Sequence, residues 1–206
     1  MTPRLSILVP CYNQEVLAIR ALDSIPRRDD IEVIASDDGS TDKTLFNLVK
    51  YKEEHPELNL IIRANGRNCG CFPNGNLLLE AARGEYMHTL DNDDFLYTEA
   101  YNGVVDMLDG EYDVYHISLH TNDNRVLFAD PNSQIRPVSN IAKFVRRAFA
   151  EGLRYRLDRP ADADWFYNAE LLARNPKCKY TGVVAYHYNY PRDGSLMDLH
   201  AKGLLK

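Results

Sequence analysis

The sequence predicts an α/β domain with one mostly parallel, twisted sheet and helices on both of its faces. Short apolar segments alternate with amphipathic helical segments through the first half of the chain, which is the pattern of parallel strands joined by helical crossovers. The chain has 206 residues, of which 45% are hydrophobic and 26% charged, enough to bury one core without disulfides or a structural metal. We therefore expect a single domain over residues 1–206.

The first half is predicted to alternate strands with helices. Residues 5–9 form an apolar run that ends at Pro10, as buried parallel strands do. Apolar side chains at helical spacing, followed by Pro26 as a stop signal, predict a helix over 14–25. The same signals predict strands at 31–35, 58–62 and 86–90, a helix that begins at Thr41 or Asp42 and ends near Glu54, a loop over 65–75 and a helix over 76–83.

The second half has a less regular pattern. The expected elements are a helix at 101–108, a strand at 113–119, a hairpin turn at 122–124 that leads into 126–129, a loop at 130–140, helices at 141–151 and 164–174, and a strand at 180–188. No internal repeat or linker interrupts this order, so the pattern favours one domain over two.

Composition excludes several classes of protein. The formal net charge of −6 disfavours broad binding to nucleic acid, which needs a basic surface. No apolar run approaches the ~20 residues of a membrane span, and the first apolar run is too short for a signal peptide. Cys11, Cys69, Cys71 and Cys178 fit no paired zinc pattern. We expect free thiols and a cytoplasmic location, with a regulatory or metal-binding Cys69/Cys71 pair as the alternative.

Polar side chains directly follow each of the first four predicted strands. Because parallel strands joined by right-handed crossovers end at one edge of a sheet, these side chains are expected to meet there, where α/β sheets bind ligands. The clusters are Cys11-Tyr12-Asn13, Asp37-Asp38, residues 65–68 and residues 91–94.

Two of these clusters are acidic. Asp91, Asp93 and Asp94 repel one another unless a cation lies among them, and such oxygen ligands suit Mg²⁺ or Mn²⁺ bound together with a substrate's phosphates. The alternative is a solvated turn in which Asp94 caps the next helix. Asp38 follows the second strand and would accept a hydrogen bond from a nucleobase such as uracil, unless its turn is only a helix cap.

Other candidates are isolated side chains. Tyr12 could stack on a base or pack against the domain. Asp162 and Asp164 open a predicted helix, where a carboxylate acts either as an N-cap or as a general base. His187 lies in a predicted strand and is either a metal ligand or a hydrogen-bonded strand histidine.

Four segments taken together resemble the family 2 glycosyltransferases of the GT-A fold. The segments are residues 6–13 (SILVPCYN), 33–42 (VIASDDGSTD), 82–86 (ARGEY) and 90–94 (LDNDD). The resemblance implies a nucleotide-sugar-binding, Rossmann-like half over 1–95 and an acceptor and catalytic-base half over 96–206. It also implies metal-dependent transfer, with inversion, from a nucleotide sugar to a hydroxyl. The donor is most often UDP-linked, and the acceptor is a glycan, a lipid-linked molecule or another hydroxyl compound.

The resemblance assigns roles by position. Asp164 matches the catalytic base, with Asp162 as the alternative because Ala163 stands where the family has Glu. Asp93 of the DxD pattern would bind Mn²⁺ or Mg²⁺, with Asp91 and His187 as further candidate ligands. The residues expected to contact the donor nucleotide are Pro10, Tyr12, Asn13, Asp38, Asn68, Gly70, Asp91, Asn92, Arg192 and Ser195.

Two other functions compete with this one. A catalytically degenerate nucleotide-binding module of the same fold is favoured by Ala163 and by Pro73, which stands near where the family has a basic residue. A sugar-phosphate nucleotidyltransferase would need a glycine-rich, basic loop after the first strand, and Cys11-Tyr12-Asn13 is not one. The DxD pair favours a transferase over both.

Overall fold

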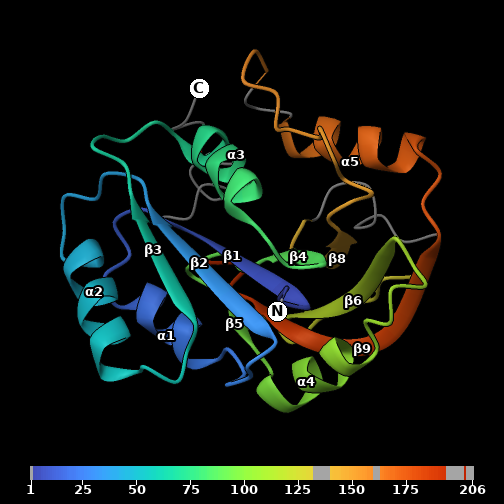
Figure 1. Cartoon of the computed structure of the whole chain (residues 1–206), viewed down its shortest axis with the longest axis horizontal. Helices are drawn as coiled ribbons and strands as arrows, with labels where there is room; N and C mark the ends of the chain where they lie inside the picture. The colour runs from blue at the N-terminus through green and yellow to red at the C-terminus, as the bar shows by residue number, and fades with distance from the viewer. Residues whose placement is uncertain (1, 132–139, 160–162, 194–201, 203–206) are drawn as a thin grey trace.

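The computed structural model describes residues 2–131, 140–159, 163–193 and 202, and these form one sheet with helices on both faces (Figure 1). The strand order is β3-β2-β1-β4-β8-β6-β9-β5, and β7 pairs with β6. The strands are β1 (Leu5–Cys11), β2 (Ile31–Asp37), β3 (Leu60–Ala64), β4 (Tyr86–Thr89), β5 (Phe95–Leu96), β6 (Val114–Thr121), β7 (Val126–Leu127), β8 (Lys143–Arg146) and β9 (Cys178–Tyr188).

The parallel part of the sheet agrees with the sequence prediction. β1 lies at its centre, and Leu5 pairs in parallel with Ile31 of β2 and Tyr86 of β4. β3 extends the parallel order beyond β2. Every residue of β1 is buried except the half-buried Pro10, which explains why this strand is apolar without alternation. The carboxyl ends of β1, β2 and β4 therefore share one edge of the sheet.

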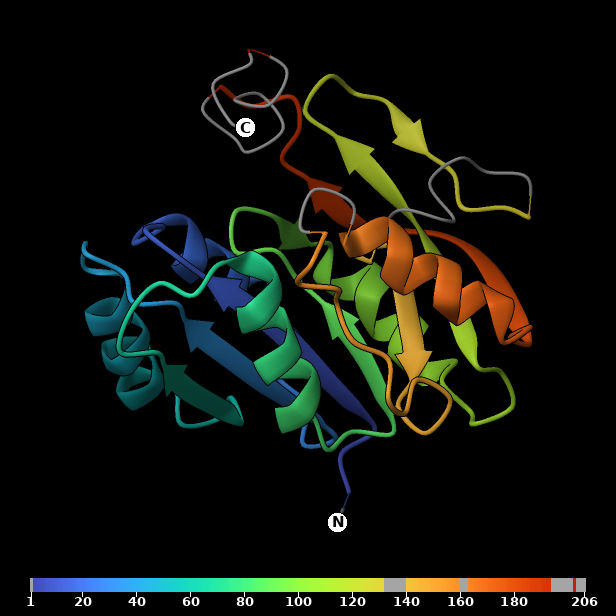
Figure 2. The ribbon, with the colours of Figure 1, turned by 90° about the horizontal axis from the view of Figure 1, so that it is seen from above.

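The helices are divided between the two faces (Figures 1 and 2). Ile7 and Val9 of β1 join one core with α1, α2 and α4, whereas Leu8 joins a second core with α3 and α5. Side chains of a strand alternate between faces, so β1 supports both cores. The helices are α1 (Leu17–Asp23), α2 (Thr44–Glu54), α3 (Cys71–Ala81), α4 (Thr98–Asp106) and α5 (Ala163–Ala173).

The predicted helix at 141–151 is wrong. Residues 143–146 form β8, which pairs antiparallel with β4 on one side and with β6 on the other. Phe144 is fully buried and stacks on His88 with ring centroids 4.3 Å apart. Burial between two strands outweighs the weak helical pattern of this segment, and residues 147–152 form turns after it.

The start of α3 also differs from the prediction. The helix begins at Cys71 rather than at residue 76, and it includes Pro73 and Gly75. Pro73 lies in the first turn, where backbone N–H groups have no hydrogen-bond acceptor within the helix. The missing N–H of proline therefore costs no helical hydrogen bond there. As a result α3 reaches the carboxyl edge of the sheet. The other boundaries shift by a few residues, and the short strand β5 is additional.

A buried glutamate anchors the turn before β4. Glu32 Oε1 accepts hydrogen bonds from Ser6 Oγ at 2.6 Å, from the Arg83 backbone N–H at 2.7 Å and from that of Gly84 at 3.2 Å. A Cβ atom on Gly84 would lie 2.5 Å from the Ser6 nitrogen. The glycine of the 82–86 segment is therefore required by close packing against β1.

This packing leads to a prediction for Gly84→Ala. Overpacking against β1 should lower the free energy of unfolding by about 1–3 kcal/mol, measured by urea denaturation. Gly103→Ala is the matched control, because Gly103 lies inside α4 with no atom within 4 Å of its added Cβ. That control should be stabilised by up to about 1 kcal/mol. Equal urea midpoints for Gly84→Ala and wild type would contradict the packing argument.

Candidate functional site

The loops after β1, β2, β3 and β4 are joined at the carboxyl edge of the sheet. Asp38 N donates to the Cys11 carbonyl at 2.8 Å, and Asn65 N donates to the Asp37 carbonyl at 2.8 Å. Asn13 Oδ1 accepts from the Thr41 backbone N–H at 2.8 Å. The polar clusters that the sequence places after these strands are therefore brought together at one rim.

Asp38 organises the loop over 65–70. Its carboxylate accepts from Asn65 Nδ2 at 2.8 Å, from Cys69 N at 3.0 Å and from Gly70 N at 2.8 Å. Burial alone would raise the pKa of Asp38, but hydrogen bonds from Cys69, Asn65 and Gly70 outweigh it and lower the pKa. Asn68 Oδ1 also accepts from Gly70 N at 2.8 Å. The predicted donor residues Asp38, Asn68 and Gly70 thus form one cluster.

The residues after β1 lie at the same rim. Pro10 is half-buried near the end of β1, and Tyr12 follows the buried Cys11 with 42% of its surface exposed. Asn13 has a positive φ of 49° and links this loop to Ser40 and Thr41. The Tyr12 ring is therefore exposed to solvent at the rim.

The four cysteines are free thiols, in agreement with the prediction. Cys69 Sγ donates to Asp38 Oδ1 at 2.9 Å. Burial, and then Asp91, Asp164 and Asp38, raise the pKa of Cys71 to about 12. Cys71 therefore lies among the carboxylates of the rim and keeps its proton at neutral pH.

The loop over 91–94 is held by β9 and by the chain that follows it. Asp94 Oδ2 accepts from Tyr186 OH at 2.6 Å, and Asp94 Oδ1 accepts from Asn189 N at 2.7 Å. Asp94 therefore does not cap the next helix, which begins at Thr98. Arg192 forms an ion pair with Asp93 at 2.6 Å, and this pair brings a predicted donor-binding arginine onto the predicted metal ligand.

Crowding of carboxylates raises two of their pKa values. Burial is the largest cause for Asp91, followed by Asp94, Asp93 and Asp164, and the pKa of Asp91 rises well above its usual value. Burial and the charge of Asp93 raise the pKa of Asp94 to about 7. A cation at this position would relieve the repulsion.

Asp93 and Asp91 fit a hard divalent cation whose remaining ligands are phosphate oxygens. Within the described ranges, no group of three or more His, Cys, Asp or Glu side chains is preformed to hold a metal. His187 Nε2 lies 2.8 Å from Asn122 Oδ1, and its Nδ1 lies 3.1 Å from Tyr97 OH. Metal binding by His187 would therefore require loss of one of these contacts.

Asp164 lies in the first turn of α5, across the rim from Asp91. Its Oδ1 accepts from Asn140 Nδ2 at 2.7 Å. Part of the residue is open to solvent, but protein atoms crowd its carboxyl group. Burial raises the pKa of Asp164 to about 6, although Lys143 and Asn140 act to lower it. Asp162 and Ser195, the other predicted site residues of the second half, lie outside the described residues.

Sequence reasoning missed the side chains that surround Asp164. Asn140 lies at the end of a predicted loop, and Lys143 lies in the segment wrongly predicted as a helix. Lys143 is 1% exposed and donates to Asn168 Oδ1 at 2.7 Å. A lysine inside the apolar run 141–145 was the one available signal, because a buried lysine needs a polar partner.

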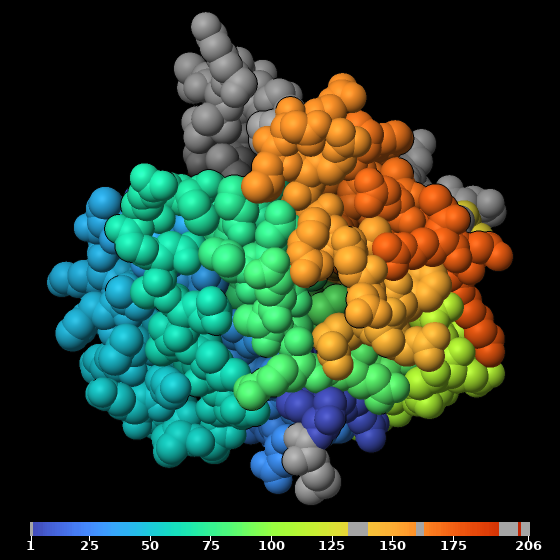
Figure 3. Space-filling view, turned by 45° about the horizontal axis from the view of Figure 1, so that its top comes forward, coloured from blue at the N-terminus to red at the C-terminus, as the bar shows by residue number. Residues whose placement is uncertain are grey.

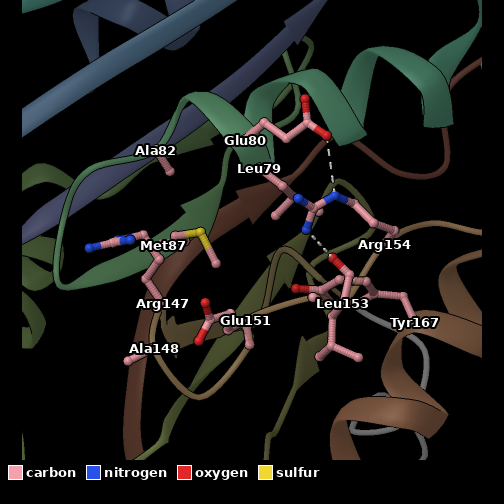
Figure 4. A pocket seen from close by; sticks show the side chains of 12 residues that line it. Leu79, Glu80, Ala82, Met87, Arg147, Ala148, Glu151, Leu153, Arg154 and Tyr167 are labelled. Carbon is pink, nitrogen blue, oxygen red and sulfur yellow. Dashed lines mark hydrogen bonds and ion pairs between the residues drawn. The ribbon is translucent and has the colours of Figure 1, made fainter.

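A hollow in the described part of the molecule lies away from this rim. It has a volume of about 310 Å³ and is lined by the C-terminal half of α3, by Met87, by residues 147–154 and by Tyr167 (Figures 3 and 4). Arg154 reaches Glu80 across it at 3.5 Å. None of the predicted site residues lines this hollow, so the candidate site is the carboxylate rim.

No helix in the described ranges combines the length and the apolar character needed to cross a membrane.

The sequence matches the family model described as glycosyl transferase family 2 over residues 6–165. A GalNAc(5)-diNAcBac-PP-undecaprenol beta-1,3-glucosyltransferase of Campylobacter jejuni is 35% identical over 102 residues, which are 48% of this chain and 32% of that protein. A poly(ribitol-phosphate) beta-glucosyltransferase of Bacillus spizizenii is 35% identical over 101 residues, which are 47% of this chain and 16% of that protein. The chain therefore spans about a third or less of these relatives.

Two solved structures share the fold. A fragment of TarS from S. aureus in complex with UDP-GlcNAc has a TM-score of 0.79 and 25% identity, covering 94% of this chain and 60% of that one. The mannosyltransferase PcManGT from Pyrobaculum calidifontis, solved with GDP-Man and Mn²⁺, has a TM-score of 0.72 and 20% identity, covering 94% and 59%. These likenesses confirm the GT-A fold predicted from the sequence.

The raised pKa of Asp164 leads to a prediction about stability. Its folded pKa of about 6 lies above the usual value of 3.8, so ionisation opposes folding and the wild type loses stability as pH rises from about 4 to 6. Asp164→Asn should therefore unfold at a higher temperature than wild type at pH 7.5 in EDTA. The difference should shrink as pH falls through about 6.

The control is Glu170→Gln on the exposed side of the same helix, which should leave the unfolding temperature unchanged at both pH values. A lower unfolding temperature for Asp164→Asn than for wild type at pH 7.5 would contradict the assignment of a raised pKa.

Proposed function

Because the chain belongs to glycosyl transferase family 2, we propose that it transfers a sugar from a UDP-linked donor to an acceptor hydroxyl in one step, with inversion at the anomeric carbon. The observation that carries this proposal is the meeting of two kinds of carboxylate at one rim. Asp91, Asp93 and Asp94 form a crowded cluster suited to a cation and a diphosphate, and Asp164 stands apart with a pKa of about 6.

The donor is proposed to lie along the ends of β1 and β2. Tyr12 would stack on the uracil, and Asp38 would accept from the uracil N–H, because Oδ2 takes only the Gly70 hydrogen bond among its described contacts and a carboxylate oxygen can take two. Support for UDP comes from TarS, which was solved with UDP-GlcNAc.

The diphosphate is proposed to lie over Asp93. A divalent cation such as Mn²⁺ or Mg²⁺, held by Asp93 with Asp91 beside it, would offset the negative charge of the departing nucleoside diphosphate. Arg192 already lies against Asp93, so its guanidinium is close enough to turn toward a phosphate oxygen.

Asp164 is proposed to be the general base. The acceptor oxygen attacks the anomeric carbon and forms a bond to it, while the bond from that carbon to the diphosphate oxygen breaks. The hydroxyl proton passes to the Asp164 carboxylate, and UDP leaves. With a pKa of about 6, Asp164 is ionised at neutral pH and can accept this proton.

The acceptor is proposed to be a hydroxyl of a glycan, of a lipid-linked molecule or of a similar compound. The name of the Campylobacter jejuni relative mentions an undecaprenol-linked glycan, and that of the Bacillus spizizenii relative mentions poly(ribitol phosphate). These names support a polyhydroxylated acceptor without selecting one.

The proposed donor site is tested by calorimetric titration of UDP. UDP should bind in the presence of Mn²⁺ and bind much more weakly in EDTA, because Asp93 would hold a cation that offsets the negative charge of the diphosphate. Asp93→Asn should weaken metal-dependent binding by about tenfold or more. Asp193→Asn is the matched control, since Asp193 is fully exposed, and it should bind UDP like wild type.

GDP is the ligand control and should bind more weakly than UDP, because Asp38 and Tyr12 are proposed to recognise uracil. Failure of both nucleotides to bind, with or without Mn²⁺, would overturn the proposal in favour of a degenerate, non-catalytic relative.

The role of Asp164 is tested by turnover. Asp164→Asn should retain UDP binding but lower the release of UDP from UDP-GlcNAc, with Mn²⁺ present and water as the acceptor, by at least about a hundredfold. A rate close to that of wild type would show that Asp164 is not the base.

A further inference from the structure

We propose that Asn140 positions the catalytic base: its side-chain amide holds Oδ1 of Asp164 so that Oδ2 faces the acceptor hydroxyl. This inference rests on the proposed function, in which Asp164 takes the acceptor's proton. It concerns a residue outside the motifs that point to the family.

The contacts of Asn140 determine how its amide is oriented. Nδ2 donates to Asp164 Oδ1 at 2.7 Å and to Tyr155 OH at 3.0 Å. Oδ1 accepts from Asn168 Nδ2 at 2.9 Å. A flipped amide would place an oxygen against the Asp164 carboxylate and an NH₂ group against that of Asn168. Only the observed orientation satisfies all three neighbours.

The orientation of Asn168 is determined in turn by Lys143. The Lys143 ammonium donates to Asn168 Oδ1 at 2.7 Å, which leaves Asn168 Nδ2 to donate to Asn140 Oδ1 and to the Asp164 carbonyl at 2.8 Å. Both Lys143 and Asn168 are buried. Hydrogen bonds therefore run in one direction from a positive charge to a negative one, and each polarises the next.

This chain of hydrogen bonds selects one oxygen of the base. Oδ1 of Asp164 is occupied by Asn140, whereas none of the described residues donates to Oδ2. An orienting bond to one oxygen fixes the rotamer of the carboxylate and leaves the other oxygen as the proton acceptor. The Asp164 carboxylate is close enough to Asp91 and Cys71 for its charge to raise the pKa of both groups.

The docking of Tyr155 supports this arrangement from the other side. Asn76 on α3 donates through Nδ2 to the Tyr155 carbonyl at 3.0 Å, and its Oδ1 accepts from Tyr155 N at 2.8 Å. A Cβ atom on Gly75 would lie 2.9 Å from the Tyr155 ring. The helix that lacks the family's basic residue thus places the tyrosine that contacts Asn140.

The decisive variant is Asn140→Asp, because it has the same shape and can still accept from Asn168 and Tyr155 but cannot donate to Asp164. With UDP-GlcNAc and Mn²⁺ as the probe and water as the acceptor, kcat for UDP release should fall about tenfold or more. The KM for UDP-GlcNAc should stay within about twofold. The variant keeps the volume of Asn140 but adds a negative charge beside Asp164, so a packing role alone would lower kcat only as far as it lowers the unfolding temperature.

Glu170→Gln is the matched control, because Glu170 lies on the exposed side of α5 and outside this chain of hydrogen bonds. It should keep kcat within about twofold of wild type. Lys143→Met is the second variant. It removes the charge at the start of the chain and should lower kcat without changing UDP binding, so the inference stays testable if Asn140→Asp folds poorly.

The outcomes separate this inference from the proposed function. Wild-type kcat in Asn140→Asp, together with an inactive Asp164→Asn, would overturn the positioning role and leave the base assignment intact. Wild-type kcat in Asp164→Asn would overturn both. A rise in KM with unchanged kcat for Asn140→Asp would assign Asn140 to donor binding and would also overturn the inference.

Discussion

Repulsion among carboxylates is the constraint on which the rest of this structure depends. Parallel pairing of β1, β2 and β4 brings acidic side chains to one edge, and each then needs a different set of neighbours to remain there. Asp38 is surrounded by loop amides, Asp94 by a tyrosine and a backbone N–H, Asp93 by an arginine, and Asp164 by an asparagine. Burial first, and then the charges of Asp94, Asp93 and Asp164, raise the pKa of Asp91 well above its usual value. Because each carboxylate has different hydrogen-bond and charge partners, chemically similar carboxyl groups acquire different properties.

The two halves of the sheet contribute differently to this rim. The parallel half supplies the strand ends and the loops that follow them, as in other open α/β sheets. The other half, in which parallel and antiparallel pairs are mixed, supplies supports: β9 carries Tyr186 to Asp94, and β8 carries Lys143 beneath α5. Because β4 pairs with both β1 and β8, the DxD loop leaves the sheet at the junction of the halves. The two kinds of carboxylate therefore approach one another from different parts of the fold.

The sequence predicts the first half of the fold well because its signals are local. An apolar run ended by Pro10, and acidic turns directly after strands, need no knowledge of distant residues. The segment 141–151 was mispredicted because burial of Phe144 comes from strands far away in the sequence. The first turn of α3 was predicted as part of the loop over 65–75, although Pro73 is tolerated in the first turn of a helix. The family, and the placement of Asp93 and Asp164 at the rim, followed from motifs and their order. Asn140 carries no motif, and its contact with Asp164 depends on β8, which begins three residues later and inserts beside β4.

The turn around Gly84 lies at the opposite end of β4 from the acidic loop, yet it determines where that loop lies because it fixes the start of the strand. The hydrogen bond from Gly84 N to Glu32 fixes where β4 begins, and the length of the strand, four residues, then fixes the position of Asp91 at the edge of the sheet. The pairing of Leu8 with Thr89 keeps β4 in register with β1. A one-residue insertion that shifted the register of β4 would move each of its side chains to the other face of the sheet. The segment 82–86 (ARGEY) therefore fixes the position of the acidic loop, although it lies at the opposite edge of the sheet.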